Sequence, residues 1–269
     1  MSLSLNTLSA AARLALVMGA CVTLAAGTQT PVRADDAPSI AAAASLRYAL
    51  DEIAKRYEKE TGKSVRITYG ATGNLVHQIE NAAPFQALFA ADDESVKKLA
   101  KGGFTEGEPV VFARGQLSLV VPKGSPVTVD TELKGLKDAL AAGKVKHVSI
   151  ANPETAPYGR AARETLQKDG LWNQVQPLLV IGENVGQAAT FVSTGAAEVG
   201  LIAQSLAISA ELAPKLDSVV VPETTHEPID HGMTLVKGAS PEAKAFADFV
   251  RGPQGRAVLE TSGFSVPTS

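Results

Sequence analysis

The sequence predicts an α/β protein with two lobes, each a mixed, mostly parallel sheet flanked by helices. Two observations support this. Short apolar runs alternate with amphipathic helical patterns along most of the chain, which is typical of parallel sheets covered by helices. In the middle, the apolar stretch GQLSLVVPKGSP (Gly115–Pro126) has no helical pattern beside it and is suited to cross into a second lobe. With 269 residues and 45% hydrophobic content, the chain can fill two medium-sized cores.

The first 34 residues are predicted to be a signal peptide rather than part of the fold. MSLSLNTLSAAAR carries one positive charge, LALVMGACVTLAAG is apolar, and TQTPVRA ends in a small-residue pattern that a signal peptidase accepts. The apolar run is shorter than a membrane span requires. We therefore expect a secretory signal that is cleaved after Ala34.

Cys21 is the only cysteine, and it lies inside this segment. It reads as one more small apolar residue of the signal, and the alternative is a lipid-attachment site that anchors the protein to a membrane. After cleavage at Ala34 no cysteine remains for a disulfide, a metal site or a nucleophile. Cleavage also removes Arg13 and Arg33 but no acidic residue, so the net charge changes from minus three to minus five. A mildly acidic chain is a poor candidate for binding nucleic acid.

Two strand-and-helix units open the first lobe. SIAAAA, beginning at Ser39, is an apolar strand, and the helical pattern that follows it ends at Gly62. VRITY (Val65–Tyr69) is the next strand, and GATG leads from it into a helix with Leu75 and Ile79 on one face.

A third unit completes the first half of the chain. Residues 85–91 are apolar and predict a strand, and Asp92 or Asp93 is placed to cap a helix that ends at Gly102.

The second half repeats the alternation and then returns to the first lobe. KHVSIAN and residues 177–204 supply strands and helices of the second lobe, Met233–Gly238 is a returning strand, and residues 241–264 are terminal helices. We therefore assign residues 35–117 and 230–269 to the first lobe and residues 118–229 to the second.

Four strand-to-helix junctions carry the functional signal. They are Ala44-Ser45, Ala71-Thr72-Gly73, Ala156-Pro157-Tyr158-Gly159 and Asn184-Val185-Gly186. Each offers small residues, and each precedes a helix whose first NH groups lack intrahelical partners and attract anions. Any one of these junctions by itself is explained by an ordinary helix cap or turn. Four together, at the carboxyl ends of strands where open α/β sheets bind ligands, favour an oxyanion site.

The residue types at these junctions indicate the kind of anion. No Lys or Arg stands at the four tips, and no Asp is present there to accept a proton from a protonated oxyanion. A site of neutral NH and OH donors fits a compact, fully ionised, tetrahedral dianion best.

The chain also resembles a known family, the periplasmic molybdate-binding proteins of ABC transporters. The resemblance lies in IAAAASLRYALDEIAKRYEKETG, YGATGNLVHQIENAAP, FARGQLSLVV, NPETAPYGRAARETL, ENVGQA with GAAEVGLIA, and FADFVRGPQGRAVLETSGF. It implies a type II periplasmic-binding-protein fold that holds molybdate or tungstate in the cleft between the lobes and delivers it to membrane permease subunits. It implies no cofactor and no bound metal other than molybdenum within the oxyanion. A monomer is the default expectation.

Position by position, the resemblance assigns roles to the junction residues. Ser45 and Thr72 match hydroxyl donors, and Tyr158 and Val185 match donors of backbone NH groups. Some relatives have a ligand-binding Tyr where this chain has Ala203, whereas others carry a Tyr in the third loop, as Tyr158 does here. The secondary candidates are Ala44, Ala71 and Asn184.

Three other functions compete with this one. A binding protein for sulfate or another small tetrahedral oxyanion would use the same cleft. An enzyme is not expected, because Ser45 has no nucleophile-elbow pattern and the four histidines, His77, His147, His226 and His231, lack metal-site spacing. We expect these histidines at the surface or at the edge of the cleft. A regulatory domain of similar architecture is disfavoured by the signal peptide and by the lack of a DNA-binding segment.

Overall fold

The computed structural model describes residues 37–267. The predicted signal peptide, its cleavage site after Ala34 and Cys21 lie outside the described residues. Within the described part of the chain, no helix is both long enough and apolar enough to cross a membrane.

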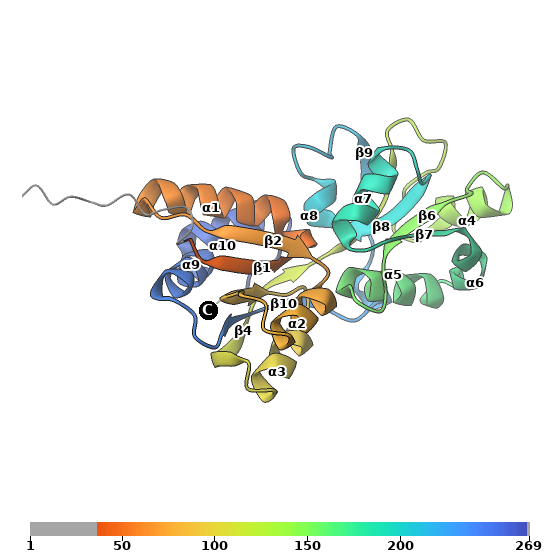
Figure 1. The fold of residues 1–269 in the computed structure, drawn as a ribbon. Coiled ribbons are helices and arrows are strands. Elements are labelled where there is room, and N and C mark those ends of the chain that lie inside the picture. Colours follow the sequence, from red (N-terminus) through yellow and green to blue (C-terminus); the bar gives the residue numbers. More distant parts are fainter. Residues whose placement is uncertain (1–36, 268–269) are drawn as a thin grey trace, which may run out of the picture. The chain divides into compact units, whose positions relative to one another are not determined.

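The first sheet contains five strands in the order β2-β1-β3-β10-β4 (Figure 1). β1 pairs in parallel with β2 and β3, whereas β10 is antiparallel to β3 and β4. The strands are β1 (Ser39–Ala43), β2 (Arg66–Gly70), β3 (Ala87–Phe89), β4 (Thr105–Gly115) and β10 (Ile229–Val236). The helices of this sheet are η2 (Ala44–Leu46), α1 (Arg47–Thr61), α2 (Thr72–Glu80), α3 (Asp93–Lys101), α9 (Pro241–Arg251) and α10 (Pro253–Thr261).

β1 is apolar and buried from Ile40 to Ala43 because both faces of the sheet are covered there. Ile40 and Ala42 belong to the large core that includes residues of α1, α9 and α10. Ala41, between them, belongs to a second core with residues of α2 and α3. Successive side chains of a strand point to opposite faces, so a central strand covered on both sides must be apolar at every position.

Local signals fix the ends of the first helices. Gly62 follows α1 with a φ of 69°, a left-handed conformation that glycine adopts without strain. The Asp92 side chain accepts a hydrogen bond of 2.9 Å from the backbone NH of Ser95 and so caps α3. The predicted cap and the predicted end near Gly102 are both confirmed.

The second sheet has the order β7-β6-β8-β5-β9, with β6 parallel to β7 and β8 and with β5 antiparallel to β8 and β9. In Figure 1, α5 and α7 lie on opposite faces of this sheet. The strands are β5 (Leu117–Pro122), β6 (Val148–Ala151), β7 (Leu179–Gly182), β8 (Val199–Ala203) and β9 (Leu216–Val220). The remaining helices are α4 (Lys134–Ala141), α5 (Pro157–Lys168), α6 (Trp172–Val175), η3 (Gln176–Leu178), α7 (Val185–Ser193), α8 (Gln204–Ala207) and η4 (Glu223–Thr225).

The predicted fold class, two mixed sheets flanked by helices, is confirmed. Each sheet has two parallel and two antiparallel pairings. The chain passes from the first sheet to the second between β4 and β5 and returns between β9 and β10. The lobe boundaries at residues 117/118 and 229/230 stay a prediction.

Three strands differ from the sequence-based expectation. β4 and β9 were not predicted, and β10 begins at Ile229 rather than at Met233. β4 and β9 are edge strands, and partly exposed side chains interrupt the apolar pattern of each. Charged residues interrupt both stretches, Glu106 and Glu108 in β4 and Asp217 in β9, so neither gives a continuous apolar signal. Position at an edge does not alone explain the difference, because β2 and β7 are edge strands too and were predicted.

Phe246 of α9 offers a test of the first core. It is fully buried, and its ring meets those of Tyr57 and Phe89 edge to face, with centroids 5.4 and 6.2 Å apart. Phe246→Ala is expected to lower the free energy of unfolding by about 3–5 kcal/mol, because it removes these contacts and leaves a cavity. Phe246→Leu, which retains most of the volume, should cost clearly less in the same urea denaturation experiment. Equal losses would contradict the cavity explanation.

Candidate functional site

The four junctions predicted from the sequence follow adjacent parallel strands. β1 leads into η2 and β2 into α2, and these two strands are neighbours. In the second sheet, β6 leads to α5 and β7 to α7, and these strands are also parallel neighbours. Because neighbouring parallel strands end at the same edge of their sheet, each sheet presents two helix N-termini side by side.

The four junctions line one small cavity. Its lining includes the predicted residues Ser45, Thr72, Tyr158 and Val185, together with the secondary candidates Ala44, Ala71 and five neighbours. The volume open to the centre of a water molecule is about 10 Å³, which is about the room that one water needs. No residue of the lining carries a charge, and its other members are Ala43, Gly70, Ala91, Ala156 and Pro157.

Backbone NH groups are the donors that this cavity offers. Within residues 37–267, the NH groups of Ser45, Thr72, Tyr158 and Val185 form no hydrogen bond. Each stands in the first turn of a helix, where the aligned peptide dipoles add a partial positive charge. The arrangement provides one free NH group from each junction.

Asn184 has a different place from the other candidates. Its side-chain oxygen caps α7 by accepting hydrogen bonds from the NH groups of Gly186 at 2.9 Å and Gln187 at 3.1 Å. It does not line the small cavity but a neighbouring, larger one. By capping these two NH groups, Asn184 leaves the Val185 NH as the free donor of its junction.

Hydrogen bonds join loops that belong to different sheets at the site. The NH of Gly73, after β2, donates to the carbonyl of Thr155, after β6, at 2.8 Å. A Cβ atom at position 73 would lie 3.0 Å from this carbonyl oxygen, so the close approach favours glycine. The Ser205 hydroxyl of α8 donates to the carbonyl of Ser45 in η2 at 2.7 Å. The junctions are therefore held together by direct contacts between the two halves of the site.

The two predicted hydroxyl donors are in different hydrogen-bonding states. The Thr72 oxygen accepts a hydrogen bond of 3.0 Å from the NH of Ala91, which leaves its own proton free to donate. The Ser45 oxygen lies 3.1 Å from Nε2 of His231. Nδ1 of His231 lies 3.1 Å from the carbonyl oxygen of Ile229, which can only accept, so Nδ1 carries a proton. In a neutral ring Nε2 then accepts, and Ser45 donates to it.

The expectation that the histidines lie at the surface or at the cleft edge was wrong for His231 and for His226. His231 is fully buried and His226 is 9% exposed. Burial lowers the pKa of His231 to about 4, against opposing effects of the Ile229 carbonyl and of the acids Asp92 and Asp230. The sequence signal that was missed is the alternation in IDHGMTLV, which places His231 and Met233 on the same face of β10.

The Tyr158 side chain, which the resemblance compares with a tyrosine in the third loop of some relatives, is buried at the site. Its hydroxyl is buried and forms no hydrogen bond within the described residues. Burial raises the pKa of this phenol, and the neighbouring Ser45 hydroxyl opposes the rise. Beneath the ring lies Gly115, where a Cβ atom would come within 2.0 Å of the Tyr158 oxygen.

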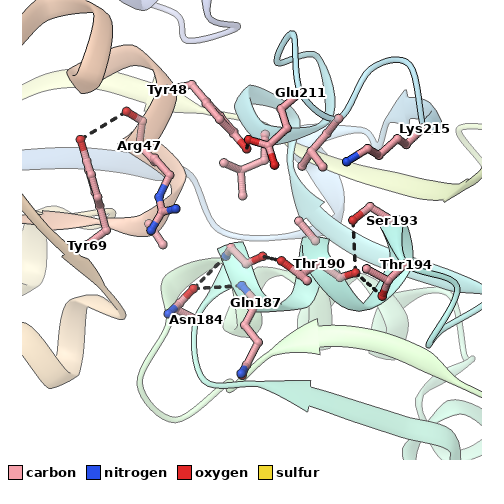
Figure 2. A pocket seen from close by; sticks show the side chains of 15 residues that line it. Arg47, Tyr48, Tyr69, Asn184, Gln187, Thr190, Ser193, Thr194, Glu211 and Lys215 are labelled. Atoms are coloured by element: carbon pink, nitrogen blue, oxygen red, sulfur yellow. Dashed lines mark hydrogen bonds between the residues drawn. The ribbon is translucent and has the colours of Figure 1, made fainter.

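A larger cavity of about 380 Å³ adjoins the small one, and Ala44 lines both (Figure 2). It is polar: the hydroxyl of Tyr48 donates to the Glu211 carboxylate at 2.9 Å, and Arg47 lies over the ring of Tyr69 at 5.2 Å. Lys215 lies further along the same wall. Charged side chains therefore line this outer cavity, whereas the lining of the inner one is neutral.

Comparisons with known proteins show the family and the fold of this chain. The family model for bacterial extracellular solute-binding proteins matches residues 38–265. The molybdate-binding protein ModA of Azotobacter vinelandii is 37% identical over 257 residues, which are 94% of this chain and 97% of the relative. The protein of the same name from Rhodobacter capsulatus is 33% identical, covering 94% of each chain. The solved structure of the Azotobacter vinelandii periplasmic molybdate-binding protein superposes with a TM-score of 0.78 and 31% identity, covering 86% of this chain and all of the other.

Thr72→Val tests whether the hydrogen bond from the Ala91 NH to the Thr72 oxygen stabilises the fold. Valine keeps the shape but removes the oxygen that accepts from the Ala91 NH, so a buried donor is left unpaired. We expect a loss of about 1–3 kcal/mol in the free energy of unfolding, measured by urea denaturation. Thr72→Ser keeps the oxygen and is the matched control. A loss of the same size in both variants would assign the effect to packing.

The pH dependence of stability tests the buried, neutral state of His231. Its folded-state pKa of about 4 lies below the value of about 6.5 in the unfolded chain, so the unfolded state binds the proton more tightly. The contribution of neutral His231 to the free energy of unfolding is therefore fully present above pH 6.5 and is lost as the pH falls toward 4. We expect His231 to account for a loss of about 2 kcal/mol between pH 7 and pH 5.

Urea denaturation of the wild type and of His231→Gln at both pH values measures this loss. The variant should lose less stability than the wild type on acidification. The exposed His77→Asn is the control and should follow the wild type. Parallel losses in all three proteins would show that other groups carry the acid sensitivity.

Proposed function

We propose a function from the premise that the chain belongs to the bacterial extracellular solute-binding proteins. In this proposal it captures molybdate or tungstate in the cavity between the two sheets and delivers the anion to the membrane permease of an ABC transporter. It acts by binding and release, so it needs neither a catalytic group nor a cofactor.

One observation carries the proposal: four free NH groups from four separate junctions line a cavity without a charged side chain. Free NH groups in the first turns of helices stabilise negative charge, and their fixed positions require no reorganisation when the ligand arrives. Donors that come from two loops in each sheet can surround a compact ion from several sides. A tetrahedral oxyanion without protons, which offers only acceptors, suits such a donor set.

The hydrogen bonds between the two sheets support capture by closure. The bonds from Gly73 to Thr155, from Ser205 to Ser45 and from Tyr48 to Glu211 join elements of the first sheet to elements of the second. The cavity in this arrangement has room for about one water, so the residues that line it must move apart to hold an oxyanion. The anion, by contacting both halves, then shifts the equilibrium toward the closed form.

The remaining parts of the proposal concern the cell and the assembly. We place the mature protein, beginning at Asp35, in the periplasm after removal of a signal peptide, with lipid attachment at Cys21 as the alternative. The lobes are residues 35–117 with 230–269, and residues 118–229. We propose a monomer, because delivery of one anion needs no symmetry.

Sulfate is the competing ligand. It is also a tetrahedral dianion and would use the same neutral donors, but its bonds are shorter and it needs a smaller shell. The relatives at 37% and 33% identity are named as molybdate-binding proteins, which favours the larger anion here.

Calorimetric titration tests the function and the choice of anion. Residues 35–269 are titrated at neutral pH with molybdate, tungstate, sulfate and phosphate. We expect one-to-one binding of molybdate and tungstate and no heat from the other two. Binding of sulfate alone would show that the proposed ligand is wrong and would leave the proposed site standing. No heat from any of the four anions would refute the proposal.

The Thr72 hydroxyl gives a sharper prediction about the site. Its free proton is placed to donate to the anion, so Thr72→Ala should weaken molybdate binding by about 1.5–3 kcal/mol, the range for hydrogen bonds to charged groups. Thr72→Ser keeps the donor and should bind within a few-fold of the wild type. If both variants titrate like the wild type, Thr72 has only a structural role.

A further inference from the structure

We infer that His231 is a positioning residue of the proposed oxyanion site, which takes up one proton from solvent when the anion binds and so frees the Ser45 hydroxyl to donate to the anion. This inference rests on the proposed function and deepens it. It concerns a buried histidine that lies 186 residues from Ser45 in the chain.

The starting point is that a serine hydroxyl has only one proton to give. As described above, Nδ1 of His231 donates to the carbonyl of Ile229, so Nε2 of the neutral ring is an acceptor and takes the Ser45 proton. In this state the Ser45 oxygen faces a ligand with lone pairs only. It would repel an oxyanion rather than bind it.

Turning the Ser45 hydroxyl toward the anion with His231 unchanged would leave Nε2 unpaired. His231 is fully buried, so no water would replace the lost donor, and an unpaired buried acceptor is costly. A proton on Nε2 removes the conflict. The imidazolium then donates from Nδ1 to Ile229 and from Nε2 to Ser45, and Ser45 donates to the anion. The only covalent change is the new Nε2–H bond, formed with one proton taken from solvent.

The unpaired state of the Tyr158 hydroxyl independently supports a Ser45 that accepts hydrogen bonds from its neighbours and donates to the anion. Within residues 37–267 it is a buried donor without a hydrogen-bond partner, and it lies beside Ser45. A serine oxygen can accept two hydrogen bonds while it donates one. In the loaded state Ser45 can accept from His231 and from Tyr158 and donate to the anion, so that all three side chains are paired.

The surroundings of His231 allow this change of charge. Phe112 of β4, Phe264 near the C-terminus and Tyr158 of α5 pack their rings around it and carry no charge. The charged groups that act on it are Asp92 and Asp230, both of which favour protonation.

Each of these two acids is paired with an arginine. Arg160 contacts Asp92 at 2.7 Å, and Arg114 contacts Asp230 at 2.6 Å. Their pull on the proton is therefore partly offset, and burial keeps the ring neutral without ligand. A dianion one hydroxyl away adds two negative charges that raise the pKa of His231.

The test is the number of protons taken up on binding. The purified protein is titrated with molybdate in buffers of different ionisation enthalpy, at a pH at which free molybdate is fully ionised. The dependence of the observed heat on the buffer gives the protons taken up. We expect uptake approaching one proton, and an association constant that falls up to tenfold for each unit of rising pH until the bound-state pKa is passed.

His231→Gln is the informative variant, because its amide NH₂ can donate to Ser45 without taking up a proton. We expect it to bind molybdate with uptake near zero and with little dependence on pH. His226→Gln is the matched control: His226 is also buried and also lies against a backbone carbonyl, that of Glu227, but it does not contact Ser45. This control should take up protons like the wild type.

A second measurement needs no variant in the site. Nitrogen NMR of the histidine rings of the wild type should show His231 with one protonated nitrogen before molybdate is added and two afterwards. Binding without proton uptake, with His231 neutral throughout, would overturn this inference and leave the proposed function intact. Failure to bind molybdate at all would overturn both, so the two failures are distinguishable.

Discussion

The site depends on the direction of four strands. β1 and β2 run parallel as neighbours in one sheet, and β6 and β7 do so in the other. Parallel neighbours deliver the helices that follow them to a common edge, with unpaired NH groups foremost. The small residues, the absence of charge in the cavity and the close contacts between loops all make sense only because this geometry brings four helix N-termini together.

A neutral site of this kind recognises charge through positioned dipoles. Arg47 and Lys215 line the outer cavity, and Arg160 is paired with Asp92. None of these cations lines the inner cavity, where the donors are backbone NH groups and hydroxyls. Such donors have fixed directions, so in the proposed function they would select an ion by its shape and by the absence of protons on it rather than by charge alone.

The sequence predicted the features that short stretches of residues determine. It did not predict features that depend on contacts between residues far apart in the chain. The junctions at Ser45, Thr72, Tyr158 and Val185 could be found because apolar runs and small-residue helix starts are written in short stretches. The structure brings these four residues to one cavity. Their role toward an anion stays a proposal. The edge strands β4 and β9 lacked a clear pattern, and the burial of His231 depends on packing against residues far away in the chain.

Gly115, where the chain leaves the first sheet for the second, lies directly against the Tyr158 side chain of the site. It is the last residue of β4, immediately before the chain enters the second sheet, and it leaves no space between its backbone and the Tyr158 hydroxyl. The main chain at this crossover and the Tyr158 side chain therefore constrain each other by direct contact. Any side chain at position 115 would collide with the Tyr158 hydroxyl, so a residue that does not line the small cavity limits where one of its side chains can lie.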